Sequence, residues 1–592
     1  MGRSTGKDSI AMISKVFFRL FPVQVAIVAM GSINSIVDGI IAGRFIDAGT
    51  VGVVGLYYTV VRILEAAGAV LLGGVAVLSG RYLGSGKLDK TRGICSLGFS
   101  MALFIGMILT ILSFAAPQTI ARLLGADADL CGPLATYIVG YGIGIIPQLL
   151  AQQLAASLQL ERKEKLTQVG VFVMIGCNVG LDILLVAVLN MGIWGLALAT
   201  SIANWAYFLV LGAYYLSPKA QLRPSLKKAS WKENGAMILI GLPNAILVAC
   251  LAARSLIVNR VLLANAGQDG LSALSAFNMV SGLAIAVALG AGAVVRMLSS
   301  VFMGEENREG ILSLLKIALT RVMLLIIALS VVFLLLAPVA AGVFFPDRTS
   351  EVYAMTRQLI SIYSLCIPLC YLNIVFSNHC QAFGYGRFVN TISVMDGLLS
   401  VAVPSLILAP VLGALGVWIS YPIGIVLTTL YCIASIAVIL KHRPRGLSQW
   451  FMLPPEFGSG ESLVLDIHDI KDVTQTASSV EKYCADHGIT GRTGTYAALC
   501  LEEIAGNIVN HGFGADRMKH HIEVRVVIMD TCVVLRIKDD CIPFNPKEWY
   551  DMVSAKKDPT ANIGIRLVYG LAKEVFYQNL LGLNVLTIKL EQ

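Results

Sequence analysis

The segment NVGLDILL, residues 178–185, places one acidic residue inside an otherwise apolar run. Asn178 precedes Asp182 by four residues, so on a helix both side chains project from one face. An ionisable group within a membrane-spanning helix is costly unless it is paired or hydrated, so its presence predicts a functional site. The alternative is a structural role, in which Asp182 caps a helix or pairs inside a helix bundle with a residue such as Arg254 or Arg62.

The composition around this segment is that of a membrane protein. Hydrophobic residues make up 56% of the 592 residues and charged residues 14%, whereas soluble proteins contain about 25% charged residues. A helix that crosses a bilayer needs about 20 apolar residues. Twelve such stretches are present, centred near residues 30, 65, 104, 145, 178, 204, 249, 285, 328, 366, 400 and 427. We therefore predict an all-α polytopic membrane protein with twelve transmembrane helices.

The order of these stretches contains an internal repeat. A displacement of 221 residues, with a slip of one residue at two positions, aligns Pro22 with Pro243, Asp38 with Asn259, Gly84 with Gly304, Gln159 with Gln381 and Gly195 with Gly416. Each unit holds six spans, which is an even number, so we predict parallel repeats about an axis normal to the membrane. The repeats cover about residues 10–218 and 230–440, and a substrate is expected between them.

Basic residues predict the orientation of the spans, because cytosolic loops carry an excess of Lys and Arg. With a cytosolic N-terminus, the inside segments include Arg81, Lys87, Lys90, Arg92, Arg162, Lys163, Lys165, Lys219, Arg223, Lys227, Lys228, Lys232, Lys441, Arg443 and Arg445. The opposite loops offer little beyond Arg44, Arg122, Arg260 and Arg348. We therefore expect a multi-pass protein of the cell (plasma) membrane with both termini in the cytosol.

A connector at residues 446–462, which contains Pro, Gly and Ser, separates the membrane part, residues 1–445, from a soluble part, residues 463–592. Residues 447–592 hold 14 Lys and Arg against 19 Asp and Glu, whereas the first 446 residues hold 31 against 18. The twelve cysteines are scattered and predict neither a disulfide framework nor a zinc site. Strands are expected at 463–467, 521–529, 531–538 and 584–590, with helices at 470–486, 493–510 and 563–574.

The membrane part resembles the MATE family of multidrug and toxin extrusion antiporters over about residues 10–440. The resemblance rests on VDGIIAGRF (37–45), NVGLDILL (178–185) and GIWGLALAT (192–200). It implies a cation- or proton-binding site formed by Asp38, Asn178, Asp182 and Thr200. Asn259 and Val403 occupy the corresponding positions of the second repeat, so the acidic site is expected in the first repeat alone.

Two carboxylates and an amide that converge in a cavity can bind a proton or a hard cation, and two like charges held close favour proton uptake. The coupling ion is therefore H⁺ or Na⁺. Three further charged residues within the spans are interpreted as pairing inside the bundle, the alternative being that they line the substrate path: Arg254, Arg321 and Asp396.

The soluble part is characterised by LEEIAGNIVNHGF, residues 501–513. Glu503, Asn507 and His511 recur every four residues and so share one helix face, from which Glu502 points away. A carboxylate and an amide one turn apart can hold Mg²⁺ and polarise a hydroxyl group. The alternative is an ordinary amphipathic helix with one polar side. Taken together with VVLRIKDDCIPFNP (533–546) and NIGIRLVYGLA (562–572), the segment favours a nucleotide site.

These three segments resemble the GHKL, or Bergerat-fold, ATPases, and in particular the anti-sigma-factor serine kinases. The resemblance implies a soluble α+β sandwich that binds ATP and Mg²⁺. It implies that Glu503 is the general base, Asn507 the Mg²⁺ ligand, Asp539 the residue that reads the adenine amine, and Gly564 part of the phosphate loop. The chain departs from the family pattern at Cys541 and Asn562, where glycines are usual.

The sequence favours a secondary antiporter that exports an amphipathic or cationic compound in exchange for H⁺ or Na⁺, with an ATP-binding regulatory domain. The second hypothesis is a membrane-anchored sensor whose serine kinase domain acts on a cytosolic protein. A third is a flippase for a lipid-linked precursor, although the Asp-Asn-Asp-Thr set favours the drug exporters. No Walker A loop is present in the sequence, so ATP-driven pumping is not expected. The expected partners are a small molecule and the lipid bilayer, not nucleic acid.

Overall fold

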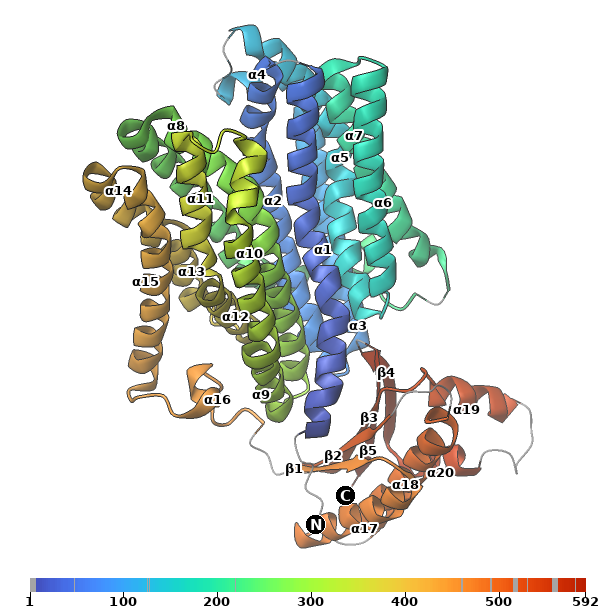
Figure 1. Cartoon of the computed structure of the whole chain (residues 1–592). Helices are drawn as coiled ribbons and strands as arrows, with labels where there is room; N and C mark the ends of the chain where they lie inside the picture. The colour runs from blue at the N-terminus through green and yellow to red at the C-terminus, as the bar shows by residue number, and fades with distance from the viewer. Residues whose placement is uncertain are drawn as a thin grey trace.

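The structure is a computed structural model. It describes residues 7–46, 48–124, 126, 128–218, 220–458, 462–489, 492–514, 520–529, 531–555, 563–580 and 582–591. A helical membrane part stands on a smaller domain built around a β-sheet (Figure 1).

Six of the expected spans form the first repeat. Its helices are α1 (Lys7–Phe45), α2 (Ala48–Gly84), α3 (Leu88–Ala115), α4 (Pro117–Leu123), α5 (Ala128–Leu160), α6 (Glu164–Asp182), the π-helical turn η1 (Ile183–Val188) and α7 (Gly192–Ala213). Polar loops end these helices, and their apolar length is sufficient to cross a bilayer.

The second repeat follows a connection that contains short 3₁₀ turns. Its helices are α8 (Asn234–Gly304), α9 (Arg308–Ile317), the π-helical turn η5 (Ala318–Val322), α10 (Met323–Phe344), α11 (Glu351–Ser364), α12 (Ile367–Phe383), α13 (Gly386–Val394), the π-helical turn η6 (Met395–Leu399), α14 (Ser400–Leu412) and α15 (Ala414–Leu440).

The predicted set of spans is recovered, with two irregularities. The described residues contain ten helices that are long and apolar enough to span a membrane, or eleven when α11 and α12, bent by 50°, count as one span. Helix α8 has 71 residues, which would be roughly 100 Å long at about 1.5 Å per residue. It is broken at Gly267, whose φ of 62° and ψ of −159° suit a residue without a Cβ. Helix α8 therefore provides two of the expected spans.

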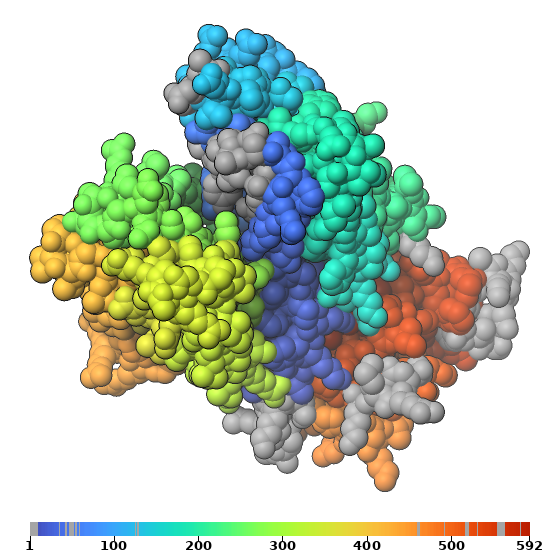
Figure 2. Space-filling view, turned by 45° about the horizontal axis from the view of Figure 1, so that its top comes forward, coloured from blue at the N-terminus to red at the C-terminus, as the bar shows by residue number. Residues whose placement is uncertain are grey.

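Helix α1 lies at the interface between the other helices of the first repeat and the second repeat. In Figure 2 it runs as a blue rod between the teal mass of the first repeat and the yellow-green mass of the second. Its buried residues Ile13, Phe17 and Phe21 pack in the hydrophobic core of the second repeat. The same helix pairs Arg19 with Glu164 of α6, at 3.1 Å, in the first repeat. The amino-terminal half of α1 thus contacts both repeats.

The C-terminal domain follows α16 (Gly446–Trp450) and consists of one sheet with helices on one face. Its elements are β1 (Ser462–Ile467), α17 (Ile470–Asp486), α18 (Thr493–Gly512), β2 (Ile522–Met529), β3 (Cys532–Asp539), α19 (Pro546–Ala555), α20 (Ile563–Leu571), β4 (Glu574–Leu580) and β5 (Leu583–Glu591). The strand order is β1-β2-β3-β5-β4, and all neighbours are antiparallel.

The α+β prediction for this domain is confirmed, but two elements were missed. The expected helix 563–574 ends at Leu571, and residues 574–580 form strand β4 instead. Val575 and Tyr577, two positions apart, both pack on the core, which is the period of a strand. No helix is predicted at the position of α19, because its ten residues give only a short pattern. Asn562 lies outside the described residues.

Candidate functional site

Asp38 and Asp182 lie together inside the first repeat although 144 positions separate them in the chain. Helix α1 carries Asp38, and α6 carries Asn178 and Asp182. All three side chains are buried, and the carboxyl groups of Asp38 and Asp182 lie close enough to interact electrostatically. Two like charges held close together favour the uptake of a proton or of another cation. This arrangement is therefore suited to holding a small cation.

The fourth predicted residue joins the same cluster. Thr200 of α7 is buried, and the side-chain amide of Asn178 donates to its hydroxyl at 3.4 Å. Both carboxylate oxygens of Asp182 and the amide oxygen of Asn178 have no hydrogen-bond partner among the described residues. Buried polar atoms of this kind are normally satisfied. Oxygen atoms without partners are the ligands that a proton or a hard cation requires.

Asp182 is the last residue of α6 before the π-helical turn η1. Such turns interrupt the regular α-helical ladder and are frequent at functional sites. Asp396 of the second repeat also lies in a π-helical turn, η6, but its surroundings differ. Arg254 donates to its backbone carbonyl at 3.3 Å and lies over the ring of Tyr421 at 5.8 Å. These contacts agree with the interpretation that Arg254 and Asp396 are neighbours inside the bundle.

The structural alternative for Asp182 is not supported by the contacts of the two arginines. Arg62 forms an ion pair with Glu65 at 2.8 Å, and Arg254 contacts Asp396 and Tyr421 in the second repeat. Arg321, the third charged residue considered, donates to the hydroxyl of Ser14 at 2.6 Å.

Two residues near the acidic pair, Asn34 and Tyr137, are not predicted from the sequence as part of the site. Asn34 is buried one turn before Asp38 and donates to the sulfur of Met174 at 3.1 Å. Its spacing to Asp38 is the same as that of Asn178 to Asp182, a signal that a search for paired Asn and Asp would have found. Tyr137 of α5, which interacts electrostatically with both aspartates, carried no comparable signal.

The two repeats pack closely at the end that carries the C-terminal domain. Gly84 of α2 and Gly304 of α8, which the repeat aligns with each other, lie at this contact. A Cβ added to Gly84 would be 2.0 Å from the carbonyl oxygen of Val301, and one added to Gly304 would be 2.1 Å from that of Arg81. Only glycine permits backbones to approach this closely, so the end next to the C-terminal domain is closed.

The C-terminal domain brings two of its predicted site residues together. Glu503 is half-buried on α18, and its carboxylate lies against Gly564, where an added Cβ would be 1.8 Å from Oε2. Asn507 lies one turn further along α18 and is also half-buried, whereas His511 is exposed. Glu502 faces α17 and accepts a hydrogen bond from Thr474 at 3.2 Å, so it points away as predicted.

Asp539 ends strand β3 and is buried. Its Oδ1 accepts hydrogen bonds from the side-chain amide of Asn584 at 2.7 Å and from the backbone N–H of Cys541 at 2.9 Å. Burial raises the pKa of Asp539, and these hydrogen bonds oppose part of that rise. Cys541 is not among the residues with positive φ, so its backbone does not require the glycine that the family pattern has there.

Comparison with known proteins agrees with both parts of the chain. The MatE family model matches residues 25–188 and 243–406, one match in each repeat. The model of the histidine kinase-like ATPase domain matches residues 468–590. The multidrug export protein MepA of Staphylococcus saprophyticus is 22% identical over 385 residues, which cover 63% of this chain and 83% of MepA. MepA of Staphylococcus aureus strain MSSA476 is 20% identical over 386 residues, covering 63% and 83%.

Solved structures share the fold of the membrane part. An outward-facing multidrug resistance MATE family transporter superimposes with a TM-score of 0.66 at 20% identity, covering 73% of this chain and 97% of its own. A mutant of the Vibrio cholerae MATE transporter VcmN gives a TM-score of 0.68 at 15% identity, covering 75% and 100%. The chain belongs to the MatE family of transporters, and a histidine kinase-like ATPase domain follows its membrane part.

Proposed function

We propose that the protein exports an amphipathic or cationic small molecule across the cell membrane in exchange for H⁺ or Na⁺. The observation that carries the proposal is the buried cluster of Asp38, Asn178, Asp182 and Thr200 in the first repeat. Entry of the ion neutralises this cluster, and the two repeats then rock about the site to expose it to alternate sides. The names of the relatives, which are multidrug export proteins, support the direction of transport.

The orientation proposed from the sequence, with both termini in the cytosol, is supported by the loops that the C-terminal domain touches. Phe576 of β4 packs near Gly86, next to the basic loop residues Lys87 and Lys90. Tyr577 interacts electrostatically with Arg162 of another basic loop. An excess of basic residues marks the cytosolic side. The proposed parts remain residues 1–445, the linker 446–462 and the ATP-binding domain 463–592.

The proposed exchange is tested with purified full-length protein in liposomes. Export of a fluorescent cationic dye should require a gradient of H⁺ or of Na⁺, and should stop when an ionophore collapses that gradient. The closeness of the Asp38 and Asp182 carboxyl groups favours the uptake of a cation, and applying the two gradients separately distinguishes H⁺ from Na⁺. Dye movement that is equally fast with and without both gradients would reject the exchange.

The domain at 463–592 is proposed to bind ATP and Mg²⁺. Asp539 would accept a hydrogen bond from the adenine amine, Asn507 would offer its amide oxygen to Mg²⁺, and the backbone around Gly564 at the start of α20 would face the phosphates. Glu503, which lies beside Gly564, would act as a general base toward a hydroxyl group. ATP supplies a transferable phosphoryl group when it is bound, and a protein substrate for that group is part of the alternative kinase hypothesis.

The substitution Asp539→Asn should reduce ATP affinity of the full-length protein at least tenfold, because an amide can turn its donor group toward the adenine amine. The ionised carboxylate accepts that hydrogen bond more strongly than the protonated acid does. Since burial raises the pKa of Asp539, wild-type affinity should fall as the pH is lowered through this raised value, and the variant should lose that dependence. Equilibrium binding of a fluorescent ATP analogue across pH measures both effects. Asp486→Asn, on an exposed part of α17, should bind as the wild type does.

A further inference from the structure

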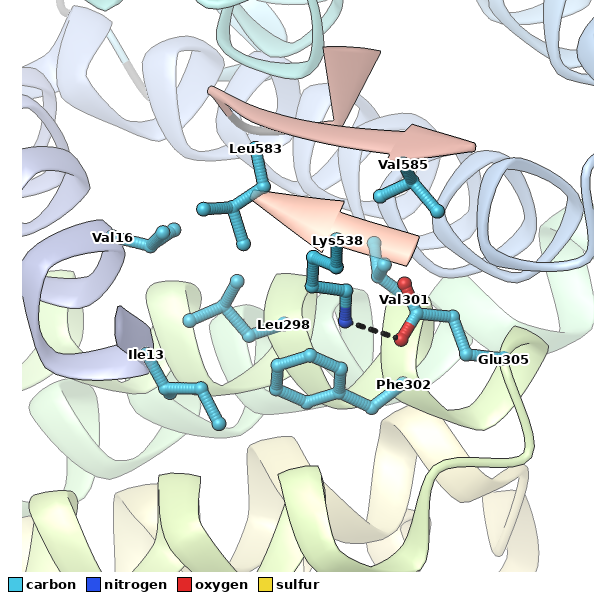
Figure 3. Close-up of a pocket in the computed structure, with 9 residues that line it drawn as sticks. All are labelled: Ile13, Val16, Leu298, Val301, Phe302, Glu305, Lys538, Leu583 and Val585. Carbon is cyan, nitrogen blue, oxygen red and sulfur yellow. Dashed lines mark hydrogen bonds and ion pairs between the residues drawn. The ribbon is translucent and has the colours of Figure 1, made fainter. Parts of the chain in front are cut away.

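The face of the sheet opposite the helices is in direct contact with the membrane part. Figure 3 shows Leu583 and Val585 of β5 opposite residues of two membrane helices, with Lys538 of β3 between them. The membrane residues that line this small space are Ile13 and Val16 of α1 and Leu298, Val301, Phe302 and Glu305 at the end of α8. This small space is thus lined mainly by apolar side chains, with Glu305 and Lys538 as the charged residues of its lining.

That pair joins the ATPase domain to the second repeat. The ammonium group of Lys538 lies 3.1 Å from a carboxylate oxygen of Glu305, and the two side chains are 6% and 3% exposed. Burial alone would raise the pKa of Glu305, but Lys538 and Arg536 outweigh it and the pKa is lowered. The Glu305 carboxylate is therefore ionised at neutral pH.

Two arginines complete the contact at the carboxyl end of α8. Arg536 donates to the carbonyl of Glu305 at 3.2 Å, and Arg525 donates to the carbonyl of Glu306 at 3.1 Å. The last carbonyls of a helix have no partner within the helix and carry partial negative charge, so cations at this end are favourable. Three basic residues of β2 and β3 thus cap α8.

The same sheet also contacts the first repeat. Asp540, directly after β3, forms an ion pair with Lys15 of α1 at 2.7 Å. The guanidinium of Arg19 lies against Gly582 of the β4–β5 turn, and Phe576 lies against Gly86 between α2 and α3. The domain therefore bridges both repeats at the end where Gly84 and Gly304 hold them together.

We call the ion pairs Lys538–Glu305 and Asp540–Lys15 the bridge. Strand β3 connects this bridge to the proposed adenine site within three consecutive residues. Successive side chains of a strand point to opposite faces of the sheet. Lys538 and Asp540 face the membrane part, where they reach Glu305 and Lys15. Asp539, between them, is buried with Asn584 and Cys541 on the other side. A ligand that orders Asp539 must also order its two neighbours.

We propose that ATP bound at Asp539 strengthens the hold of Lys538 and Asp540 on the two repeats, and so inhibits transport by keeping this end of the transporter closed. This regulation rests on the proposed nucleotide binding and the proposed alternating movement of the repeats. When the ligand has already ordered β3, less conformational entropy is lost as the Lys538–Glu305 and Asp540–Lys15 ion pairs form. ATP binding and closure of this end therefore favour each other. By linkage, closure of this end tightens ATP binding by the same factor.

The test uses full-length protein in liposomes with a non-hydrolysable β,γ-imido ATP analogue on the side of the ATPase domain. Two readouts are followed: the rate of dye export, and the labelling rate of Ser300→Cys by a membrane-impermeant thiol reagent. Ser300 is buried at the closed end, facing α2. In the protein with an intact bridge, the analogue should slow both rates about fivefold or more, within the usual range of allosteric coupling.

The bridge is broken with Lys538→Met or Glu305→Gln, and more gently with Lys15→Met, whose side chain is half exposed. The first two variants should bind the analogue and lose its effect on both rates, and the third should lose part of it. Lys589→Met is the matched control, because it removes an exposed lysine–glutamate pair from the same sheet. It should respond as the intact protein does.

The outcomes separate the proposals. A full response in Lys538→Met and Lys15→Met overturns the coupling, as does binding of the analogue to the intact protein with no change in labelling. Absence of analogue binding overturns the nucleotide site and the coupling with it. The labelling readout does not depend on the coupling ion, so it tests the regulation even when dye export fails to follow an ion gradient.

Discussion

Replacing Asp182 with asparagine is expected to abolish ion-driven export by the full-length protein while leaving it folded in the membrane. Asparagine has nearly the same size and polarity, but it neither binds a proton nor provides a negative charge for a cation. Both oxygens of Asp182 lack hydrogen-bond partners among the described residues, so few native hydrogen bonds are lost. The initial rate of gradient-driven dye export should fall at least tenfold, and the thermal unfolding midpoint of the purified protein should change little.

The specificity of this effect can be checked within the same repeat. Glu65→Gln removes another acid from the first repeat, but Glu65 is paired with Arg62 and lies outside the cluster. Its export rate should stay close to that of the wild type. Asp38→Asn should reproduce the loss, and combining it with Asp182→Asn should add nothing further, because the two carboxylates act as one site. Unchanged export in Asp182→Asn would contradict the assignment of the coupling site.

The substitution Gly84→Val or Gly304→Val should prevent closure of the end next to the ATPase domain and reduce export more than tenfold. A Cβ at these positions would lie 2.0 Å and 2.1 Å from backbone oxygens of the opposite repeat. Backbone atoms within packed helices cannot move aside as a flexible side chain does, so the repeats must separate. Labelling of Ser300→Cys should become faster in these variants, since its surroundings would open to water.

Gly132→Val is a suitable control for the closure experiment. Gly132 also lies within a helix, α5, but nothing is within 4 Å of a Cβ at that position. Its export and labelling rates should match those of the protein that carries Ser300→Cys alone. Wild-type export by Gly84→Val would mean that close contact of α2 and α8 is not part of the transport cycle.

Much of the acidic cluster could be predicted from the sequence because its signals are local. An aspartate inside an apolar run is rare, and Asn178 and Asp182 share a helix face through simple helical spacing. The internal repeat indicated that Asn259 and Val403 replace the two acids in the second half. Tyr137 could not be predicted, since one tyrosine in an apolar helix has no distinguishing pattern, and its proximity to the aspartates depends on how α5 packs.

In the C-terminal domain, too, some elements could be predicted from local sequence patterns and others could not. The long amphipathic helices α17 and α18 and the alternating strands β2 and β3 were predicted close to their observed bounds. Strand β4 and helix α19 were missed, because segments of seven and ten residues give short patterns that either element can fit. The strand order β1-β2-β3-β5-β4 also depends on pairing between distant segments.

The amino-acid sequence by itself determined the membrane class, the two repeats, the paired acids of the first repeat and the ATPase-type domain, because hydrophobic length, periodicity and short motifs are properties of neighbouring residues. Only the tertiary structure decided that Glu305 meets Lys538, 233 residues away, and that Gly84 and Gly304 close one end. These contacts join surfaces that come together only when both parts of the chain have folded and packed. A local sequence pattern does not predict contacts between segments so far apart in the chain.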